Sequence, residues 1–352
     1  MNKSSIILKY FQKVHLLTVD NPDYCRTISS LFEWLTENDR IKNDRTTQLL
    51  NLDKQITVKI IARQKLIMAG MEEIAYLLKK YTHLSLSVKC KDSQSVNKDQ
   101  IVAEITGSTS EVLAYERTVL NILQRMSGIA CQTSSLIRLI RSIRPISNIF
   151  IAATRKTPWM ALDKKAVAAG GGLTHRLDLS DGILIKDNHL KSIREKYHLA
   201  NNNEAIKKSL ELIFSQAKNQ LIEVEVENEE EILAAINSFQ ELNNYICHCE
   251  ESRFNKDDAA ISVPMGLLLR QPADRNDKSN QLCIMFDNFT PAKAKQTIEK
   301  IKKDYDVSNI IFEASGGITS ENISKWRQTG VDFLSLGSLT HSPKAADLSI
   351  EF

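Results

Sequence analysis

The residues whose types and spacing most clearly suit ligand binding or catalysis are concentrated in residues 153–190, which read ATRKTPWMALDKKAVAAGGGLTHRLDLSDGILIKDNHL. The stretch contains six basic residues and two histidines: Arg155, Lys156, Lys164, Lys165, Arg176 and Lys186, with His175 and His189. A cluster of cations predicts an anionic ligand, because unpaired charges at a partly buried site are costly. Arginine binds carboxylate and phosphate groups through two parallel hydrogen bonds. The stretch therefore predicts a binding site for a small polyanionic molecule.

Acidic residues lie at the ends of two later apolar runs. Glu225 belongs to LIEVEV, and Asp287 follows QLCIMF directly. Two carboxylates suit Mg²⁺, which binds a few carboxylates together with waters and substrate oxygens. Strand alternation also places Glu223 and Glu227 on the face of Glu225. Two hypotheses follow for these three acids: they face cations or metal inside a barrel, or they point outward from an edge strand.

Two glycine-containing turns follow the last two apolar runs of the chain. They are Ser315-Gly316-Gly317 and Gly337-Ser338. Glycine lets backbone N–H groups approach an anion closely, and the corresponding region of α/β barrels often holds a phosphate. The turns and the two acids together predict a Mg²⁺-phosphate compound as the second ligand. Ordinary strand-to-helix turns are the alternative.

The elements that must position these groups recur from residue 148 onward. Apolar, β-rich runs each end in a polar or glycine-rich segment, at residues 148–154, 182–185, 221–226, 281–286, 309–314 and 332–336. Helical segments such as 204–217 and 291–303 separate most of them. Strands alternating with helices predict a parallel sheet, and at least six repeats favour a closed α/β barrel over an open sheet. In such a barrel the strand ends meet at one mouth, which accounts for cations at the ends of buried strands.

The first 110 residues follow a different pattern. An amphipathic helix is expected over 68–81, and two strands are expected over 84–90 and 101–108, which together indicate an α+β unit of modest size. From Glu111 to Ile143 the apolar residues recur at helical spacing. Gly128 is expected to break this segment into two helices.

Composition excludes several classes of protein. The chain has 352 residues, of which 42% are hydrophobic and 25% charged, as is ordinary for a globular protein. Its net charge of +3 argues against a surface that coats nucleic acid. No apolar run is long enough to span a membrane. The N-terminal apolar region is interrupted by Lys9, Lys13 and His15, which disfavours a signal peptide. The six cysteines are therefore expected to be reduced thiols in the cytoplasm. Cys247 and Cys249 have no second pair at zinc-site spacing, and no metal is predicted there.

Taken together, the motifs resemble the quinolinate phosphoribosyltransferase family, also called carboxylating nicotinate-nucleotide pyrophosphorylase, of NAD biosynthesis. Seven stretches appear in the family's order: ERTVLNILQRMSGIA (116–130), TRKTPW (154–159), KKAVAAGGGLTHRLDLSDGILIKDNH (164–189), IEVEVEN (222–228), IMFDNFTP (284–291), EASGGI (313–318) and GVDFLSLGSLTHS (330–342). The first hundred residues match only in general character.

The resemblance implies an α/β fold of type II phosphoribosyltransferase kind. An N-terminal α/β sandwich would span residues 1–112, and an incomplete, TIM-like α/β barrel would span residues 113–352. The family reaction joins quinolinate to phosphoribosyl pyrophosphate and gives nicotinate mononucleotide, pyrophosphate and CO₂, with Mg²⁺ as cofactor. The resemblance also implies a homodimer or higher assembly in which one subunit's N-terminal domain covers the other's barrel mouth. Neither nucleic acid nor membrane is an expected partner.

The resemblance also implies roles for individual residues. The quinolinate pocket would be lined by Arg155, Lys156, His175, Arg176 and Lys186, and Arg117 would reach across the dimer. The 5′-phosphate would be held by Ser315, Gly316, Gly317, Gly337 and Ser338. Glu225 and Asp287 would serve the Mg²⁺ and ribose side, directly or through water or substrate. Lys156 and Lys186 are both candidates for assisting decarboxylation, and the choice between them stays open.

The chain departs from the family pattern in two places. The family commonly has TRKTTP followed by glycine, whereas Pro158-Trp159-Met160 follow Thr157 here, so this loop is expected to differ in geometry while the cations are retained. Residues 245–280 have no counterpart in the family pattern. We interpret them as an insertion on the face opposite the site, where loop length is tolerated best. A regulatory or partner-binding surface is the alternative role.

Two other functions are compatible with the sequence. One is the related pyrophosphorylase of molybdate-uptake operons, and the other is a barrel that binds ligands but has lost turnover. The KDNH stretch and the complete set of cations favour the quinolinate enzyme over the first. The intact acids Glu225 and Asp287 argue against the second, because a pure binding protein would not need them.

Overall fold

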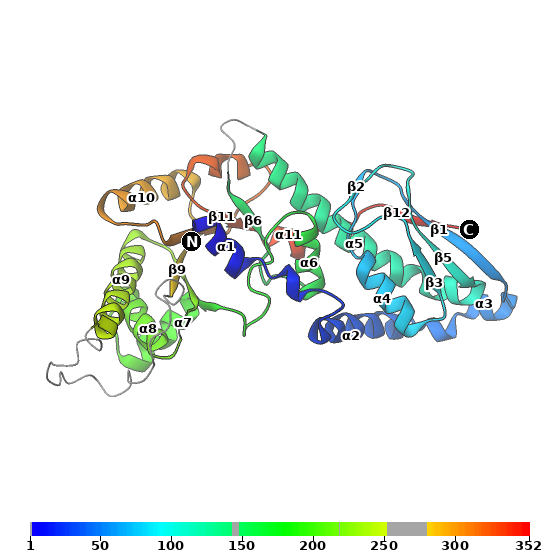
Figure 1. Ribbon diagram of the computed structural model, residues 1–352, viewed down its shortest axis with the longest axis horizontal. Helices are drawn as coiled ribbons and strands as arrows, with labels where there is room; N and C mark the ends of the chain where they lie inside the picture. Colours follow the sequence, from blue (N-terminus) through cyan, green and yellow to red (C-terminus); the bar gives the residue numbers. More distant parts are fainter. Residues whose placement is uncertain (1, 143–147, 218, 252–279) are drawn as a thin grey trace. The chain divides into compact units, whose positions relative to one another are not determined.

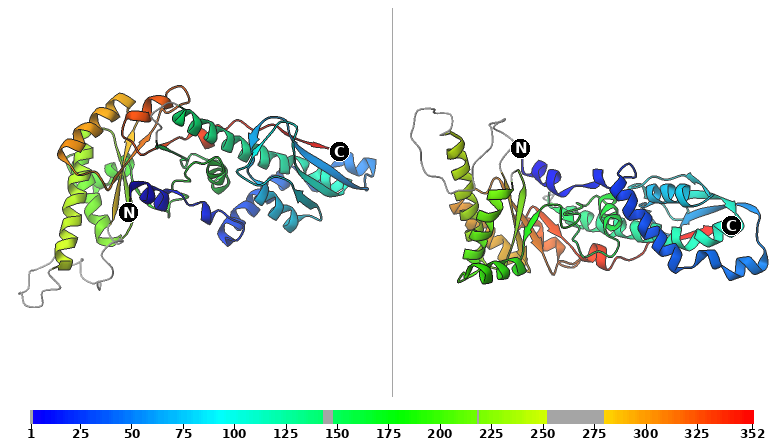
Figure 2. Two further views of the ribbon diagram at one scale, coloured as in Figure 1. Left: turned by 45° about the horizontal axis from the view of Figure 1, so that its top comes forward. Right: turned by 90° about the horizontal axis from the view of Figure 1, so that it is seen from below.

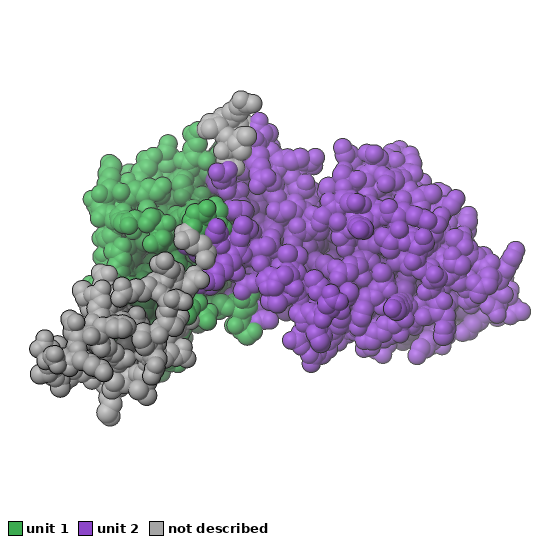
Figure 3. Space-filling model, viewed as in Figure 1, with its two compact units in different colours: residues 1–4, 179–317, 325–334 green, residues 5–178, 318–324, 335–352 purple. Residues whose placement is uncertain are grey.

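The protein is described by a computed structural model over residues 2–142, 148–217, 219–251 and 280–352, with the backbone alone for 244–251. Two compact units make up the described chain (Figure 3). Unit 1 comprises Met1–Ser4, Leu179–Gly317 and Lys325–Leu334, and unit 2 comprises Ser5–Asp178, Ile318–Ser324 and Ser335–Phe352. In the ribbon views, each unit combines helices with β-strands (Figures 1 and 2).

A four-stranded antiparallel sheet organises the N-terminal part of unit 2. Its order is β12-β1-β5-β3, with β1 Gln55–Ala62, β3 Ser85–Val88, β5 Ile101–Ser108 and β12 Leu348–Glu351. Buried Val58 and Ile60 alternate with more exposed neighbours along β1, as expected for a sheet with one buried face. A register shift between Ile60 and Ile61 lets both side chains be buried. The C-terminal strand β12 thus completes the sheet formed by the N-terminal residues.

One long helix, α5 Thr109–Arg141, packs against this sheet. Ser108 caps its first turn by accepting a hydrogen bond from the Glu111 N–H at 3.2 Å. The predicted break at Gly128 is wrong, because the helix is continuous through this residue. A Cβ at Gly128 would lie 2.1 Å from the carbonyl oxygen of Lys344. The glycine therefore allows the segment before β12 to approach the helix closely.

The remaining described elements of unit 2 are several helices and three short strands. Asn21 caps α2 through the Asp23 N–H, and Pro22 is its first residue. The helix expected over 68–81 is present as α4, beginning at Met71. The bounds are α2 Pro22–Asn38, α3 Arg45–Leu50, α4 Met71–Tyr81, α6 Ala161–Ala169, α11 Ser338–His341, β2 Leu66–Ile67, β4 Ser95–Val96 and β6 Phe150–Ala152, and α1 Lys3–Phe11 precedes them.

Parallel strands form the sheet of unit 1. Their order is β11-β10-β9-β8-β7, with β7 Ile183–Ile185, β8 Leu221–Val226, β9 Gln281–Asp287, β10 Ile310–Ser315 and β11 Phe333–Ser335. The strand interiors are almost wholly buried, as expected for a parallel sheet covered on both faces. Phe286 stacks on Phe312 at 5.7 Å between ring centroids, in neighbouring strands of this core.

Helices connect these strands as the alternating pattern predicts. Their bounds are α7 Asp187–Tyr197, α8 Asn202–Gln216, α9 Glu229–Glu251 and α10 Pro291–Asp304. Helix α8 packs against α7 and α9, and α9 also contacts β8 and β9. All six apolar runs predicted from residue 148 onward contain a strand, which confirms those predictions. The predicted insertion, 245–280, lies outside the residues whose side chains are described, apart from Asn280.

Candidate active site

The carboxyl ends of β7, β8 and β9 bring three of the predicted site residues together in unit 1. Lys186 follows β7, Glu225 lies near the end of β8, and Asp287 ends β9. Because these strands are neighbours in the sheet, the three side chains share one edge. The Lys186 Nζ lies 3.3 Å from the Glu225 Oε2. The Glu225 side chain is only 14% exposed, so this carboxylate is largely enclosed.

The environment of Glu225 makes ionisation of its carboxyl group less favourable than it is in water. Burial raises the pKa of the carboxyl above its ordinary value, the Lys186 ammonium opposes this shift, and the Asp287 charge adds to it. The lysine therefore does not fully compensate the two acids. Together, the groups favour additional positive charge at this edge of the sheet.

Sequence reasoning missed Asn288, which connects Asp287 to the first glycine turn. The Asn288 N–H donates to the Ser315 carbonyl at 2.9 Å, and its side-chain Nδ2 donates to the Asp287 Oδ2 at 2.8 Å. A Cβ at Gly316 would lie 2.2 Å from the Asn288 Oδ1, so glycine is required for this packing. The available signal was the asparagine after Asp287 in FDNFTP, because asparagine tolerates the positive φ of 54° found there.

Gly317 is the most open position of this turn. It has a φ of +61°, and a Cβ placed on it would meet nothing within 4 Å. Free space next to an exposed backbone suits a small ligand such as a phosphate, and the left-handed conformation explains the glycine. Binding of a 5′-phosphate by Ser315, Gly316 and Gly317 stays a prediction.

A loop after β6 carries the first two predicted cations in unit 2. Arg155 and Lys156 are both exposed. The Lys156 N–H donates to the Thr154 Oγ1 at 3.1 Å, and the Lys156 carbonyl accepts from the Thr340 Oγ1 at 2.8 Å. A Cβ at Gly337 would lie 3.1 Å from the Lys156 Cδ. Unit 2 therefore brings Lys156 next to Gly337, the first residue of the second glycine turn.

His175 and Arg176 lie on a second loop of unit 2. His175 is 5% exposed, and its ring centroid lies 5.0 Å from that of Phe11. Its N–H donates to the Phe11 carbonyl at 2.9 Å, and its φ is +54°. Arg176 is half-buried. The His175 imidazole is therefore enclosed against Phe11, whereas the Arg176 side chain is partly accessible.

Other members of the basic stretch have structural contacts. The Lys165 Nζ lies 2.6 Å from the Glu73 Oε1 and also pairs with Glu72. Lys164 is fully buried. His189 lies in the first turn of α7, where its Nδ1 accepts from the Lys186 N–H at 3.1 Å. These positions show that the stretch combines groups for a site with groups that stabilise it.

The acids flanking Glu225 occupy different environments. Glu223 is buried, whereas Glu227 lies exposed beyond the end of β8. The hypothesis of an outward-facing edge strand is wrong, because β8 pairs with both β7 and β9. Only Glu223 and Glu225 therefore share the interior side of this strand.

The last two predicted residues are also described. Arg117 lies on α5 with an exposed side chain, and its Nη2 is 4.0 Å from the Glu116 Oε1. Ser338 begins the short helix α11. An exposed ion pair of this kind contributes little to stability, so Arg117 can leave Glu116 and bind another partner at a small cost in free energy.

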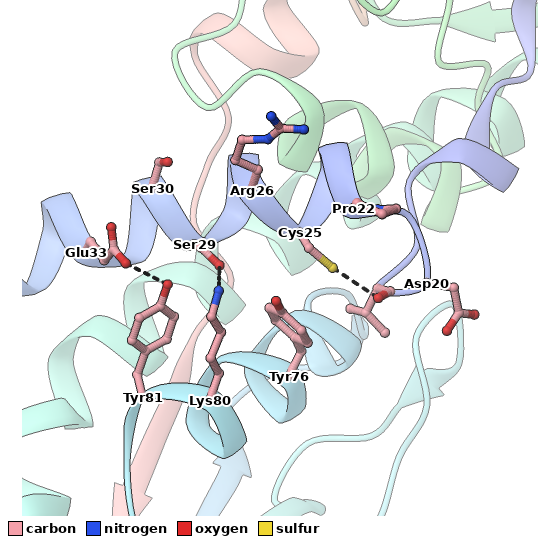
Figure 4. A pocket seen from close by; sticks show the side chains of 11 residues that line it. Asp20, Pro22, Cys25, Arg26, Ser29, Ser30, Glu33, Tyr76, Lys80 and Tyr81 are labelled. Carbon is pink, nitrogen blue, oxygen red and sulfur yellow. Dashed lines mark hydrogen bonds between the residues drawn. The ribbon is translucent and has the colours of Figure 1, made fainter.

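A cavity of about 570 Å³ lies elsewhere in unit 2, between α2 and α4 (Figure 4). Its lining includes Cys25, Glu33 and Lys80, and the Lys80 Nζ donates to the Ser29 Oγ at 3.0 Å across it. None of the predicted site residues lines it. We therefore do not place the active site there.

Comparison with known proteins decides the family. The sequence model of the quinolinate phosphoribosyl transferase N-terminal domain matches residues 44–127, and that of the C-terminal domain matches residues 129–246 and 272–351. The chain belongs to the quinolinate phosphoribosyl transferase family. The family match passes over residues 247–271, within the predicted insertion.

Relatives of this family match over nearly the whole chain. A probable carboxylating nicotinate-nucleotide pyrophosphorylase of Bacillus subtilis is 33% identical over 314 residues, covering 88% of this chain and 87% of the relative. One of Methanothermobacter thermautotrophicus is 30% identical over 313 residues, covering 88% and 92%. The nicotinate-nucleotide pyrophosphorylase structure from Francisella tularensis is 26% identical, with a TM-score of 0.69 over 93% of this chain and 96% of that one.

These findings confirm the predicted family and fold class. The division at residues 112 and 113, the insertion, and the roles of individual site residues stay predictions. Within the described residues, the helices are too short or too polar to cross a membrane.

Proposed function

We propose that the protein transfers the phosphoribosyl group of phosphoribosyl pyrophosphate to quinolinate with decarboxylation, giving nicotinate mononucleotide, pyrophosphate and CO₂. The observation that carries this proposal is the match of both domains of one enzyme family over most of the chain. The curated relatives are themselves named carboxylating pyrophosphorylases. The enzyme would therefore act in NAD biosynthesis, and the molybdate-type and non-catalytic alternatives are not favoured.

Quinolinate binding is assigned to the cations. The substrate carries two adjacent carboxylates, so it needs several positive groups, and Arg155, Lys156, Arg176 and Lys186 supply them. His175 is proposed to line the same pocket with its imidazole. Exposed Arg155 and Lys156 are available to a ligand, and their backbone is fixed by hydrogen bonds on both sides of the loop. Arg155→Ala and Arg176→Ala should therefore mainly raise the KM for quinolinate.

Ribosyl transfer is assigned to the acids at the ends of β8 and β9. The pyridine nitrogen attacks the anomeric carbon, and the carbon–oxygen bond to pyrophosphate breaks with both electrons leaving on the pyrophosphate. Positive charge develops on the sugar, and fixed negative groups aimed at it lower the barrier. Glu225 and Asp287 are proposed for this role. Lys186 holds the Glu225 carboxylate at 3.3 Å and so orients it.

Decarboxylation follows from the charge on the ring. Once the nitrogen is ribosylated it is cationic, so the bond to the neighbouring carboxylate can break with its electron pair left on the ring carbon. CO₂ leaves, and a proton replaces it on that carbon. An ammonium group can stabilise the carbanion and deliver the proton. Lys156 and Lys186 are the two candidates, and Lys156→Met and Lys186→Met, compared by CO₂ release, distinguish them.

Mg²⁺ is the proposed cofactor, and the donors in unit 1 fit it. Glu225 and Asp287 provide carboxylate oxygens, and their mutual repulsion, which contributes to the raised pKa of Glu225, is of the kind that a divalent cation relieves. When bound, Mg²⁺ supplies charge neutralisation to the pyrophosphate group. Chelation should therefore abolish activity, and added Mg²⁺ should restore it.

The 5′-phosphate is assigned to the two glycine turns, Ser315-Gly316-Gly317 and Gly337-Ser338. The open space at Gly317 supports this assignment. We also propose a homodimer or higher assembly in which the N-terminal domain covers the partner's site and Arg117 reaches its quinolinate. The exposed side chain of Arg117 on α5 supports that role. A cytoplasmic location is proposed because Cys25, Cys90, Cys131 and Cys283 are free thiols in the described part of the chain.

Release of CO₂ from carboxyl-labelled quinolinate tests the proposal. The purified full chain should release CO₂ only when phosphoribosyl pyrophosphate and Mg²⁺ are both present, with an equal amount of nicotinate mononucleotide formed. Nicotinate and nicotinamide serve as alternative acceptors. Ribosyl transfer to either of them in preference to quinolinate would overturn the assignment, and binding of quinolinate without any product would support the non-catalytic alternative.

A further inference from the structure

Two buried, oppositely charged residues follow the loop that carries Arg155 and Lys156. Asp163 and Lys164 lie in the first turn of α6, and both are 0% exposed. Buried charges are costly unless they are paired and hydrogen-bonded. A pair of such residues beside a proposed binding loop therefore requires an explanation, and the contacts of each residue provide it.

The Asp163 carboxylate binds the far end of the Arg155 loop. Its two oxygens each accept a hydrogen bond of 2.8 Å from Arg125, through Nε and Nη2. The oxygen bound by Nη2 also accepts from the Thr157 hydroxyl and, at 3.4 Å, from the Trp159 N–H. A two-pronged arginine–carboxylate pair is a rigid geometry. Asp163 thus anchors the segment that immediately follows the two cations.

Arg125 connects the same network to Lys156 from the other side. Its Nη2 donates to the Thr340 carbonyl at 2.8 Å, and the Thr340 hydroxyl donates to the Lys156 carbonyl at 2.8 Å. The guanidinium also lies over the Trp159 ring, 5.0 Å from its centroid. The backbone of Lys156 is consequently held by a closed series of contacts that begins and ends at Arg125.

Lys164 connects this loop to the second cation loop. Its Nζ donates to the Thr154 carbonyl at 3.2 Å and to the Thr174 carbonyl at 2.9 Å. Thr154 directly precedes Arg155, and Thr174 directly precedes His175 and Arg176. The Ala153 N–H also donates to the Leu173 carbonyl at 3.0 Å, so the buried ammonium extends a backbone link toward the residues that bind quinolinate in the proposal. Four of those five residues lie on the two segments that it joins.

We propose that Asp163, Arg125 and Lys164 are positioning residues that fix the spacing of the cation loops and so set the preference for a pyridine with two adjacent carboxylates. The inference rests on the proposed function. Two carboxylates at a fixed separation need two cation groups at a fixed separation, whereas a monocarboxylate such as nicotinate needs only one. Loosening the spacing should therefore penalise quinolinate more than nicotinate. Stability alone does not explain the network, because buried ion pairs are often no more stabilising than apolar residues.

The test measures kinetic constants of the full-length enzyme for Asp163→Asn, Arg125→Lys and Lys164→Met. We expect the quinolinate KM to rise by about tenfold, equivalent to about 1.4 kcal/mol, because the geometry loosens. The KM for phosphoribosyl pyrophosphate should stay near that of the wild type. Inhibition by nicotinate should weaken less than quinolinate binding does. Added methylguanidinium should partly restore the quinolinate KM of Arg125→Ala.

Glu73→Gln and Lys165→Met are the matched controls. They break the buried ion pair between Glu73 and Lys165, which lies on the same helix as Asp163, with 2.6 Å between Lys165 Nζ and Glu73 Oε1. This ion pair does not involve either of the two loops that carry the cations. These variants should lose stability without a selective change in quinolinate KM. Arg125→Lys keeps the charge and serves if Asp163→Asn does not fold.

The outcomes separate this inference from the proposed function. A wild-type enzyme that releases no CO₂ from quinolinate contradicts the proposed function itself. If the wild type is active but the three variants keep its quinolinate KM, the positioning role is contradicted. The same holds if the variants raise the KM values of both substrates equally and, like the controls, only lose stability. A selective rise in quinolinate KM, with rescue by methylguanidinium, supports it.

Discussion

The ammonium of Lys186 lies 3.3 Å from the carboxylate of Glu225, at the ends of two neighbouring parallel strands. Even with this cation beside it, burial and the Asp287 charge keep the pKa of Glu225 above its ordinary value. The folded protein therefore holds this carboxyl group in a place where its ionisation is less favourable than in water. Such groups are typical of active sites, where function rather than stability decides the residue.

Glu225→Gln should stabilise the protein while slowing turnover. Because the pKa is raised on folding, Glu225 favours the folded state below its ordinary pKa of 4.5, and this contribution is lost as pH rises through the folded pKa. Above the folded pKa the ionised group therefore costs stability, and glutamine should raise the free energy of unfolding there. The gain should shrink in acid. Loss of a charge-stabilising group should lower kcat by about 100-fold. Urea unfolding at several pH values and steady-state kinetics measure both.

Substitutions at two neighbours of Glu225 should shift the acid limb of the pH profile of kcat in opposite directions. Asp287→Asn removes a charge that raises the pKa of Glu225, so the limb should move to lower pH. Lys186→Met removes a charge that lowers it, so the limb should move to higher pH. Shifts of the same sign in both variants would show that Glu225 is not the titrating group.

Met160→Gly should stabilise the protein. Met160 has φ +49° and ψ −119°, a conformation that costs a side chain about 1–3 kcal/mol and glycine little. Its side chain is 49% exposed, so little packing is lost. Glycine also gives the unfolded chain more conformational entropy, which lowers the free energy of unfolding by about 0.4–1 kcal/mol. The expected net increase in the free energy of unfolding is about 1 kcal/mol. Met160→Ala is the control, because it keeps the Cβ. An equal gain in both variants would mean that backbone strain is not the cause.

The sequence predicts most of the fold and the charged side chains of the candidate site, but not the contacts that hold those side chains in position. Buried parallel strands are almost uniformly apolar and end in polar residues, so β7 to β11 are visible in the chain, as are the cations and acids. The contacts of Arg125 with Asp163 and Thr340 are not visible, because they join residues 38 and 215 positions apart. The prediction at Gly128 fails for the same reason. A glycine in a helix looks like a break unless the backbone that approaches it, at Lys344, is known.

Gly128→Ala should therefore destabilise the protein despite the higher helix propensity of alanine. The added Cβ would lie 2.1 Å from the Lys344 carbonyl oxygen and 3.0 Å from the Ala346 nitrogen, both backbone atoms that cannot rotate away. Overpacking of this kind costs about 1–3 kcal/mol. Ser135→Ala, at an exposed position of the same helix, should change stability by less than about 0.5 kcal/mol. Hydrogen exchange of β12 should accelerate only in the glycine variant.

Removal of residues 247–271, the part not matched by the family, should leave activity and quinolinate KM unchanged. A deletion extended through Asn280 should be destabilising. The Asn280 Oδ1 accepts from the Gln220 N–H at 3.0 Å, and its Nδ2 donates to the Ala217 carbonyl at 3.2 Å. Deletion of Asn280 removes both hydrogen bonds, and each bond of this kind contributes about 0.5–1.5 kcal/mol to stability. Loss of activity in the shorter, folded deletion would favour the regulatory role.

Arg117→Ala and Lys186→Ala should complement each other if the proposed dimer shares its sites. Each single variant should be nearly inactive. In a heterodimer, one site combines an intact Lys186 with the partner subunit's Arg117, and the other site lacks both groups. A random mixture of the two refolded chains should therefore regain about one quarter of wild-type activity, since half of its dimers are heterodimers with one intact site. Arg117→Ala mixed with the double variant is the control and should regain nothing. Heterodimers isolated with two affinity tags that remain inactive would place Arg117 in its own subunit's site or outside the reaction altogether.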